Sequence, residues 1–256
     1  MKRFQLAVKN IKTVQVVKTN RFYFFVRSLF SFPLLHAKKL ILSIIILYSI
    51  SADAQNTVDT AYQKVVIQRA AKIINTLAIH DAVQYDKAQK LLVDQYIKLN
   101  AIHDGSKLAI SEIKAKQLSN DGVNEAVKQA VEKKSTALKQ LHGQFITQLK
   151  QILTDAQIEK VKDGMTYRVL PVTWAAYMDM LQHLTPEQKD KMYSWLLEAR
   201  ELAMDEGSSD TKHAVFGKYK GKINNYLSAA GYDMKKEGEE WARRIQKARD
   251  EKNTKN

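Results

Sequence analysis

The chain has 256 residues, with 41 lysine and arginine residues against 27 aspartate and glutamate residues, and it contains no cysteine. The lack of cysteine excludes disulfide bonds and thiolate metal sites, and it also excludes a lipid-modified N-terminal cysteine. Only three prolines and nine glycines occur, which favours helices over strands.

Two cations, an apolar run and a small-residue ending follow one another early in the chain. Lys38 and Lys39 precede the 11-residue run Leu40–Ile50, and Ala52-Asp53-Ala54 follows it. This order is typical of a secretory leader, and the run is shorter than the roughly 20 residues of a membrane span. We therefore predict cleavage after Ala54 and an exported protein, periplasmic or secreted, that is soluble and has no stable membrane span after cleavage.

A leader of residues 1–54 is longer than the usual 15–30 residues. We interpret 38–54 as the true leader, with the start codon assigned too far upstream; the alternative is a long basic segment. Residues 1–54 hold nine cations and one acid, which leaves residues 55–256 with a net charge of +6. The basic excess therefore belongs mostly to the leader, and we predict no nucleic-acid partner.

Helical spacing of apolar residues begins after Thr57 and continues along the chain. Asp81 is placed to cap a helix, and Ser119-Asn120-Asp121-Gly122 supplies a turn. The next helix has a nearly heptad seam, formed by Val127, Val131, Leu138, Leu141, Phe145, Leu149 and Ile152. Residues 82–153 are therefore predicted to form a long antiparallel helical hairpin.

Shorter helices are predicted after the hairpin. Thr154 with Gln157, and Thr185 with Gln188, have capping-box spacing. Thr173 can cap a short helix to Leu181, Gly231 can end a helix at its C′ position, and Asp233 can cap the last one. The predicted fold is all-α: a helical bundle with a hairpin at about 82–153 and a C-terminal set of shorter helices. Residues 55–256 form its single domain, with a frayed tail at 249–256.

Four segments in the C-terminal half carry a resemblance to a known family. They are VKDGMTY at 161–167, EARE at 198–201, AMD at 203–205 and GKYKGKINNYL at 217–227, with a weaker match at 102–104. Over residues 60–245 the chain resembles the exported bacterial family called domain of unknown function 3826. That family has no established activity, but its members tend to occur beside polysaccharide-degradation systems. The resemblance thus implies carbohydrate as a candidate ligand.

Polar residues in the same half form the candidate ligand-binding site. They are Asp163, Tyr167, Arg200, Glu201, Asp205, His213, Lys218, Lys220, Asn224 and Asn225. Gly217 and Gly221 interrupt a helix at a cost of roughly 1 kcal/mol each, so we expect something to approach the backbone there. A sugar ring, an acidic sugar carboxylate and a packed helix are all open interpretations of what approaches the backbone.

The acids at 198, 201 and 205 share one helical face. They can bind a hard cation or pair with nearby cations, and the presence of Arg200 makes internal ion pairs the expected outcome. The histidines show neither i, i+4 spacing nor an HExxH motif, so no zinc site and no cofactor are predicted.

Three functions remain open. The first is carbohydrate binding in a polysaccharide-utilisation context. The second is a periplasmic structural or chaperone-like role, suggested by the two Leu-Thr-x-x-Gln helix starts. The third is an enzyme that acts on polysaccharide. Sequence alone identifies neither catalytic residues nor the oligomeric state.

Overall fold

A computed structural model describes residues 61–116 and 119–253, and every regular element in this part of the chain is helical. The predicted all-α fold is thus confirmed. The predicted leader, 1–54, lies outside the described residues. Within the described ranges, no helix combines the length and the apolar character that a bilayer crossing requires. The chain from Tyr62 onward forms one compact unit.

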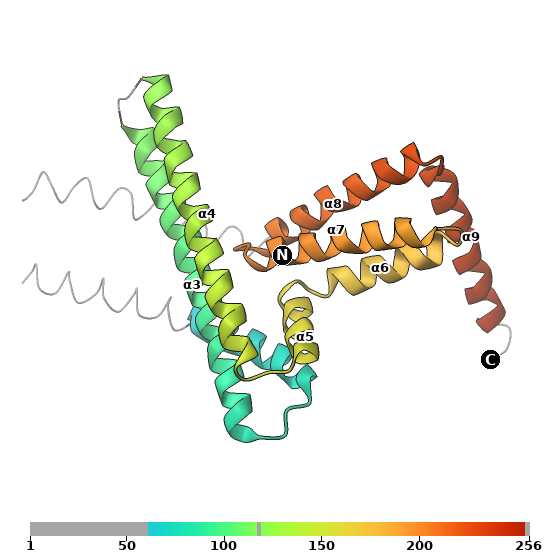
Figure 1. The fold of residues 1–256 in the computed structure, drawn as a ribbon, viewed down its shortest axis with the longest axis horizontal. Helices are drawn as coiled ribbons and strands as arrows, with labels where there is room; N and C mark the ends of the chain where they lie inside the picture. The colour runs from blue at the N-terminus through green and yellow to red at the C-terminus, as the bar shows by residue number, and fades with distance from the viewer. Residues whose placement is uncertain (1–60, 117–118, 254–256) are drawn as a thin grey trace, which may run out of the picture. The chain divides into compact units, whose positions relative to one another are not determined.

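The predicted hairpin is present as two long helices that lie side by side (Figure 1). Residues 61–74 are helical and lead through the 3-10 helix η2 (Asn75–Leu77) to α3 (Ala82–Ala115) and α4 (Asn120–Lys150). The Asp81 side chain accepts a hydrogen bond from the Gln84 amide and so caps α3, as predicted. Ser119 caps α4 in the same way.

Five further helices follow the hairpin. They are α5 (Asp155–Met165), α6 (Val169–Met180), α7 (Pro186–Met204), α8 (Ser209–Ala229) and α9 (Met234–Asn253). Both predicted capping boxes are complete, at Thr154 and at Thr185. Gly231 ends α8 with a φ of 94°, and the amide of Tyr232 donates to the Leu227 carbonyl at 3.0 Å, which is a Schellman arrangement.

Two sequence predictions differ from the structure. Thr173 does not cap a helix, because α6 already begins at Val169 and Thr173 lies inside it. The cause is the left-handed conformation of Tyr167 and Arg168, which redirects the chain between α5 and α6. In addition, α9 continues as far as Asn253, so the segment 249–253 is helical where we expected fraying.

Two apolar clusters form the core. The first joins the helix at 61–74, η2, the hairpin and α5, and Met204 from the end of α7 also belongs to it. The second joins α6, α7 and α8 around Leu196, Phe216 and Ile223, which are all fully buried. Because α7 contributes to both clusters, its C-terminal end is where the hairpin meets the later helices.

Close backbone approach occurs at glycines other than those the sequence suggested. A methyl group added at Gly217 or Gly221 would meet no described atom within 4 Å, so none of the helices that the structure describes packs against them. At Gly164 the added carbon would lie 2.8 Å from Ile73 Cγ1, and at Gly207 it would lie 2.8 Å from the His103 ring. Gly164 therefore lets α5 approach the helix at 61–74.

We expect Gly164→Ala to lower the free energy of unfolding by about 1–2 kcal/mol, because the β-branched Ile73 has little freedom to move away. Gly105→Ala on α3 is the matched control, since nothing lies within 4 Å of its added methyl group. The control should raise stability by about 0.5–1 kcal/mol. Urea denaturation of both variants measures the difference, and equal stabilisation by the two would contradict the packing described here.

Candidate functional site

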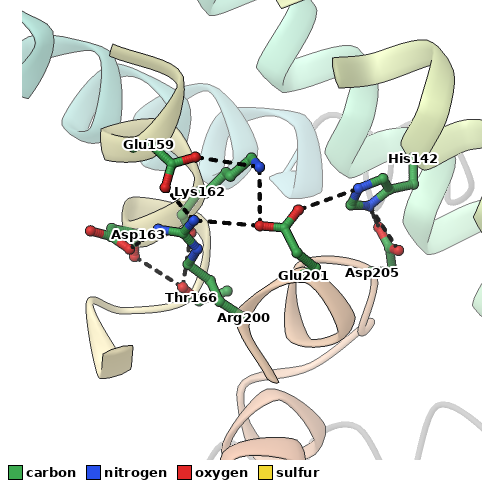
Figure 2. Close-up of polar contacts among 8 residues, drawn as sticks. All are labelled: His142, Glu159, Lys162, Asp163, Thr166, Arg200, Glu201 and Asp205. Atoms are coloured by element: carbon green, nitrogen blue, oxygen red, sulfur yellow. Dashed lines mark hydrogen bonds and ion pairs between the residues drawn. The ribbon is translucent and has the colours of Figure 1, made fainter. Parts of the chain in front are cut away.

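A buried arginine holds α5 against α7 (Figure 2). The Arg200 side chain is only 3% exposed. Its Nη1 donates to Asp163 Oδ1 at 2.8 Å, and its Nη2 donates to the Glu159 carboxylate. A buried guanidinium requires paired carboxylates, because it keeps its charge at any pH at which the protein folds.

The network continues across α7 through Glu201. Lys162 Nζ donates to Glu201 Oε1 at 3.0 Å, and Arg200 Nη2 lies 3.4 Å from the same oxygen. The other carboxylate oxygen of Glu201 lies 3.5 Å from Nε2 of His142 on α4. A chain of alternating charges thus runs from α5 through α7 to the hairpin, as Figure 2 shows.

Two histidines of the hairpin bind the end of α7. His142 Nδ1 lies 3.0 Å from Asp205 Oδ2, and His103 Nε2 lies 2.7 Å from the Asp205 carbonyl oxygen. The Gly207 backbone packs directly on the His103 ring. An N–H donor satisfies a free carbonyl at a helix C-terminus, so the His103 contact caps α7. Together with the His142–Asp205 pair, it fixes the end of α7 to the hairpin.

Hydrogen bonds and neighbouring charges shift the pKa values of His142 and Glu201, which connect α7 with the hairpin. Hydrogen bonds to Asp205 and Glu201 raise the pKa of His142 to about 9, so its ring is an imidazolium at neutral pH. Burial alone would raise the pKa of Glu201, but hydrogen bonds from His142 and Lys162 and the Arg200 charge lower it to about 2. Both groups therefore carry full charge at neutral pH.

Beside this network lies a small cleft, which we call the tyrosine cleft. Its walls come from the helix at 61–74, α3, the α5–α6 turn, the α7–α8 loop and the start of α8. They comprise Tyr62, Arg69, Tyr96, Leu99, Asn100, Tyr167, Glu206, Gly207, Ser208, Ser209 and Lys212. The cleft encloses about 20 Å³, which is room for about one water molecule.

Tyr167 stands at the edge of the tyrosine cleft in a strained conformation. Tyr167 and Arg168 both have a φ of 57°, which costs a residue other than glycine roughly 1–2 kcal/mol. The Tyr167 side chain is 44% exposed, and its ring stacks on His213 with centroids 5.5 Å apart. Such strain in a non-glycine residue is a mark of functional sites.

Two cations accompany the tyrosines of the cleft. The Arg69 guanidinium lies over the Tyr96 ring, with its carbon 5.4 Å from the centroid. The Lys212 side chain is only 4% exposed, and its ammonium donates to the carbonyls of Ala203 and Met204 at 2.8 and 3.0 Å. Burial lowers the pKa of Lys212 to about 8.

The predicted site residues divide into three groups. Asp163, Arg200, Glu201 and Asp205 meet in the ion network, as the expected internal pairing requires. Tyr167 and His213 meet at the cleft.

The remaining four lie along the exposed side of α8 and do not join either group: Lys218, Lys220, Asn224 and Asn225. Of these, Asn224 accepts a hydrogen bond from the Tyr177 hydroxyl at 2.7 Å and so links α6 to α8.

Sequence reasoning missed several residues of both groups: Tyr62, Arg69, Tyr96, His142, Glu159, Lys162 and Lys212. For one of them, Lys212, the sequence contained a pattern that could have identified it. Lys212 lies on the apolar line that continues through Phe216, Tyr219 and Ile223 at steps of four, three and four. A cation on a buried helix face indicates a specific partner.

No group of three or more histidine, aspartate or glutamate side chains is placed to hold a metal ion within 61–116 and 119–253. Glu201 and Asp205 are instead bridged by His142.

The chain was also compared with known proteins. The model of the family described as "protein of unknown function (DUF3826)" matches residues 63–247, which is more than half of the chain. No curated protein matches.

We expect His142→Gln to destabilise the protein in a pH-dependent manner. Because the folded-state pKa is raised from 6.5 to about 9, the contribution of His142 is complete below pH 6.5 and disappears as the pH rises through 9. The variant should lose roughly 2–3 kcal/mol at pH 6 and far less at pH 9.5. Denaturation at both pH values measures this, with the exposed His80→Gln as control. A loss of stability that does not change with pH would disprove that a charged His142 stabilises the fold through Glu201 and Asp205.

Replacing Arg200 by methionine should cost about 3–5 kcal/mol, because Glu159, Asp163 and Glu201 would lose their shared cation. Arg243 pairs with Glu240 at the surface with 72% of its side chain exposed, so Arg243→Gln should cost under about 0.5 kcal/mol. Thermal or urea unfolding tests the pair of variants, and similar small losses for both would show that the buried network is unimportant.

Proposed function

The chain belongs to the DUF3826 family, and we propose that it is an exported protein that binds an acidic carbohydrate at the tyrosine cleft. The leader-like segment before residue 55 supports export. The chemistry of the cleft supports the ligand class.

The observation that carries the proposal is the partly exposed Tyr167 ring, which a strained backbone holds at the cleft, stacked on His213. Aromatic rings bind the apolar faces of sugars. Tyrosine is common at binding sites where one side of the ring contacts apolar groups and its hydroxyl contacts water. Arg69 is exposed, and no carboxylate in the described part of the chain lies within ion-pair distance of it. Its planar guanidinium suits a uronic-acid carboxylate.

The size of the cleft defines the mode of binding. A volume of about 20 Å³ admits one water molecule and not a sugar ring. The sugar would therefore lie across the mouth, with its ring on Tyr167 and its carboxylate toward Arg69. This mode is open along the sugar chain, which suits a polysaccharide better than a free monosaccharide.

The two other functions have less support. A general acid in a glycosidase needs a carboxyl with a raised pKa, whereas hydrogen bonds and nearby cations hold that of Glu201 at about 2. The two Leu-Thr-x-x-Gln starts form complete capping boxes, so local helix stability accounts for the motif that suggested a chaperone.

We expect Tyr167→Gly to abolish most of the affinity for acidic oligosaccharides without loss of stability. Glycine relieves the positive φ but removes the ring, and a lost stacking contact of about 1–1.5 kcal/mol weakens binding roughly tenfold. Calorimetric titration with oligogalacturonates measures the affinity, and thermal unfolding measures the stability.

Arg168→Gly is the matched control for that experiment, because it relieves the same backbone strain and leaves the Tyr167 ring in place. Its affinity should stay within about twofold of the parent protein, since Arg168 does not line the cleft. Unchanged affinity in Tyr167→Gly, or no binding of any acidic or neutral oligosaccharide by the parent protein, would refute the proposed function.

A further inference from the structure

A second cluster of cations and aromatic rings lies on the surface that α7 and α8 form together. We call it the Trp195 face, and it consists of Lys191, Trp195, Tyr219, Lys222 and Tyr226. None of its members lines the tyrosine cleft. Along α8, Lys222 lies ten residues beyond Lys212, which places it about 15 Å farther along the helix axis.

Two ammonium groups share one indole ring on this face. Lys222 Nζ lies 4.5 Å from the Trp195 ring centroid, and Lys191 Nζ lies 5.6 Å from it. The two nitrogen atoms are therefore at most about 10 Å apart.

Each lysine also has a second aromatic neighbour. Lys222 lies over the Tyr219 ring at 5.4 Å, and Lys191 lies over the Tyr226 ring at 5.8 Å. Cation–aromatic contacts restrict the long lysine side chains, so less conformational entropy is lost when an anion binds.

Neither ammonium group forms an ion pair with a carboxylate of the described residues. In the described ranges no carboxylate comes within 4.0 Å of Lys191 Nζ or Lys222 Nζ, although other lysines such as Lys90 and Lys162 form such pairs. Glu198, one turn beyond Trp195 on α7, interacts with the Tyr219 hydroxyl. Two like charges held near each other without an anion form a ready site for one.

We propose that the Trp195 face is a second binding surface, which takes the carboxylate or sulfate groups of an acidic polysaccharide through Lys191 and Lys222. The inference extends the proposed function, but it depends on observations outside the tyrosine cleft. A polymer that carries repeated acidic groups can place one or more of them against two cations that lie within about 10 Å of each other. Contact at two surfaces would also increase the avidity for long chains over short ones.

The test compares two double variants of the full-length protein that remove the same charge. Lys191→Gln with Lys222→Gln alters the Trp195 face, and Lys98→Gln with Lys107→Gln alters exposed lysines on α3. Binding of polygalacturonate, dextran sulfate, neutral dextran and single-stranded DNA is measured by calorimetry at low and at physiological salt. The first double variant should bind the acidic polysaccharides about tenfold more weakly, and the control should change less than about twofold, since charge-assisted contacts are lost only in the first.

Several results would overturn the inference. An equal loss in both double variants would mean that net charge alone attracts the polymer, and an unchanged affinity in the first would mean that the polymer binds elsewhere. Tighter binding of the DNA, lost with the same substitutions, would assign the face to nucleic acid. A Tyr167→Gly variant separates the two sites: if it alone loses binding, only the tyrosine cleft is functional, and if only the lysine variant does, the Trp195 face stands and the proposed cleft fails.

Discussion

The arrangement of the helices depends on how the charge of Arg200 is compensated. A guanidinium that is almost fully buried cannot lose its proton, so the fold must supply carboxylates at hydrogen-bond distance. Asp163 and Glu159 do so from one face of α5, and this requirement fixes both the distance and the rotation of α5 against α7. The same placement of α7 positions Glu201 and Asp205 against His142 of the hairpin.

The C-terminal end of α7 is a second point of convergence. His103, His142 and Lys212 all direct donors at residues 203–205, where the helix leaves its last carbonyls free. These three donors come from α3, α4 and α8, so one helix end connects both helices of the distant hairpin with the helix that follows it in the chain. The favourable interaction of a cation with the negative end of a helix dipole adds to the contacts of His142 and Lys212.

Local signals in the sequence were sufficient for much of the fold. Capping residues such as Asp81, Thr154 and Thr185 act within four residues of themselves, and the hairpin seam is a periodic pattern, so both could be predicted from the sequence. The start of α6 could not, because it depends on two left-handed residues, neither of which is a glycine.

The candidate site was less predictable for the same physical reason. Asp163 and Arg200 lie in two of the segments that resemble the family. The sequence identified both as site residues, but it did not show that they pair with each other. The local sequence around His142 and Arg69 does not indicate their roles, because their partners are distant in the chain. His142 binds Asp205, which is 63 residues away, and Arg69 lies over the ring of Tyr96 on another helix. Gly217 and Gly221 suggested a close approach that the described residues do not make. A glycine on an exposed helix surface cannot be distinguished by sequence alone from a glycine against which another helix packs.

The walls of the tyrosine cleft come from five separate places in the chain, between Tyr62 and Lys212. No continuous fragment shorter than this span contains the whole site. The hairpin expressed by itself would carry Tyr96 without Tyr167, and the C-terminal helices by themselves would carry Tyr167 without Arg69. The cleft therefore exists only in the folded chain as a whole, and grafting a single peptide onto another protein would not reproduce it.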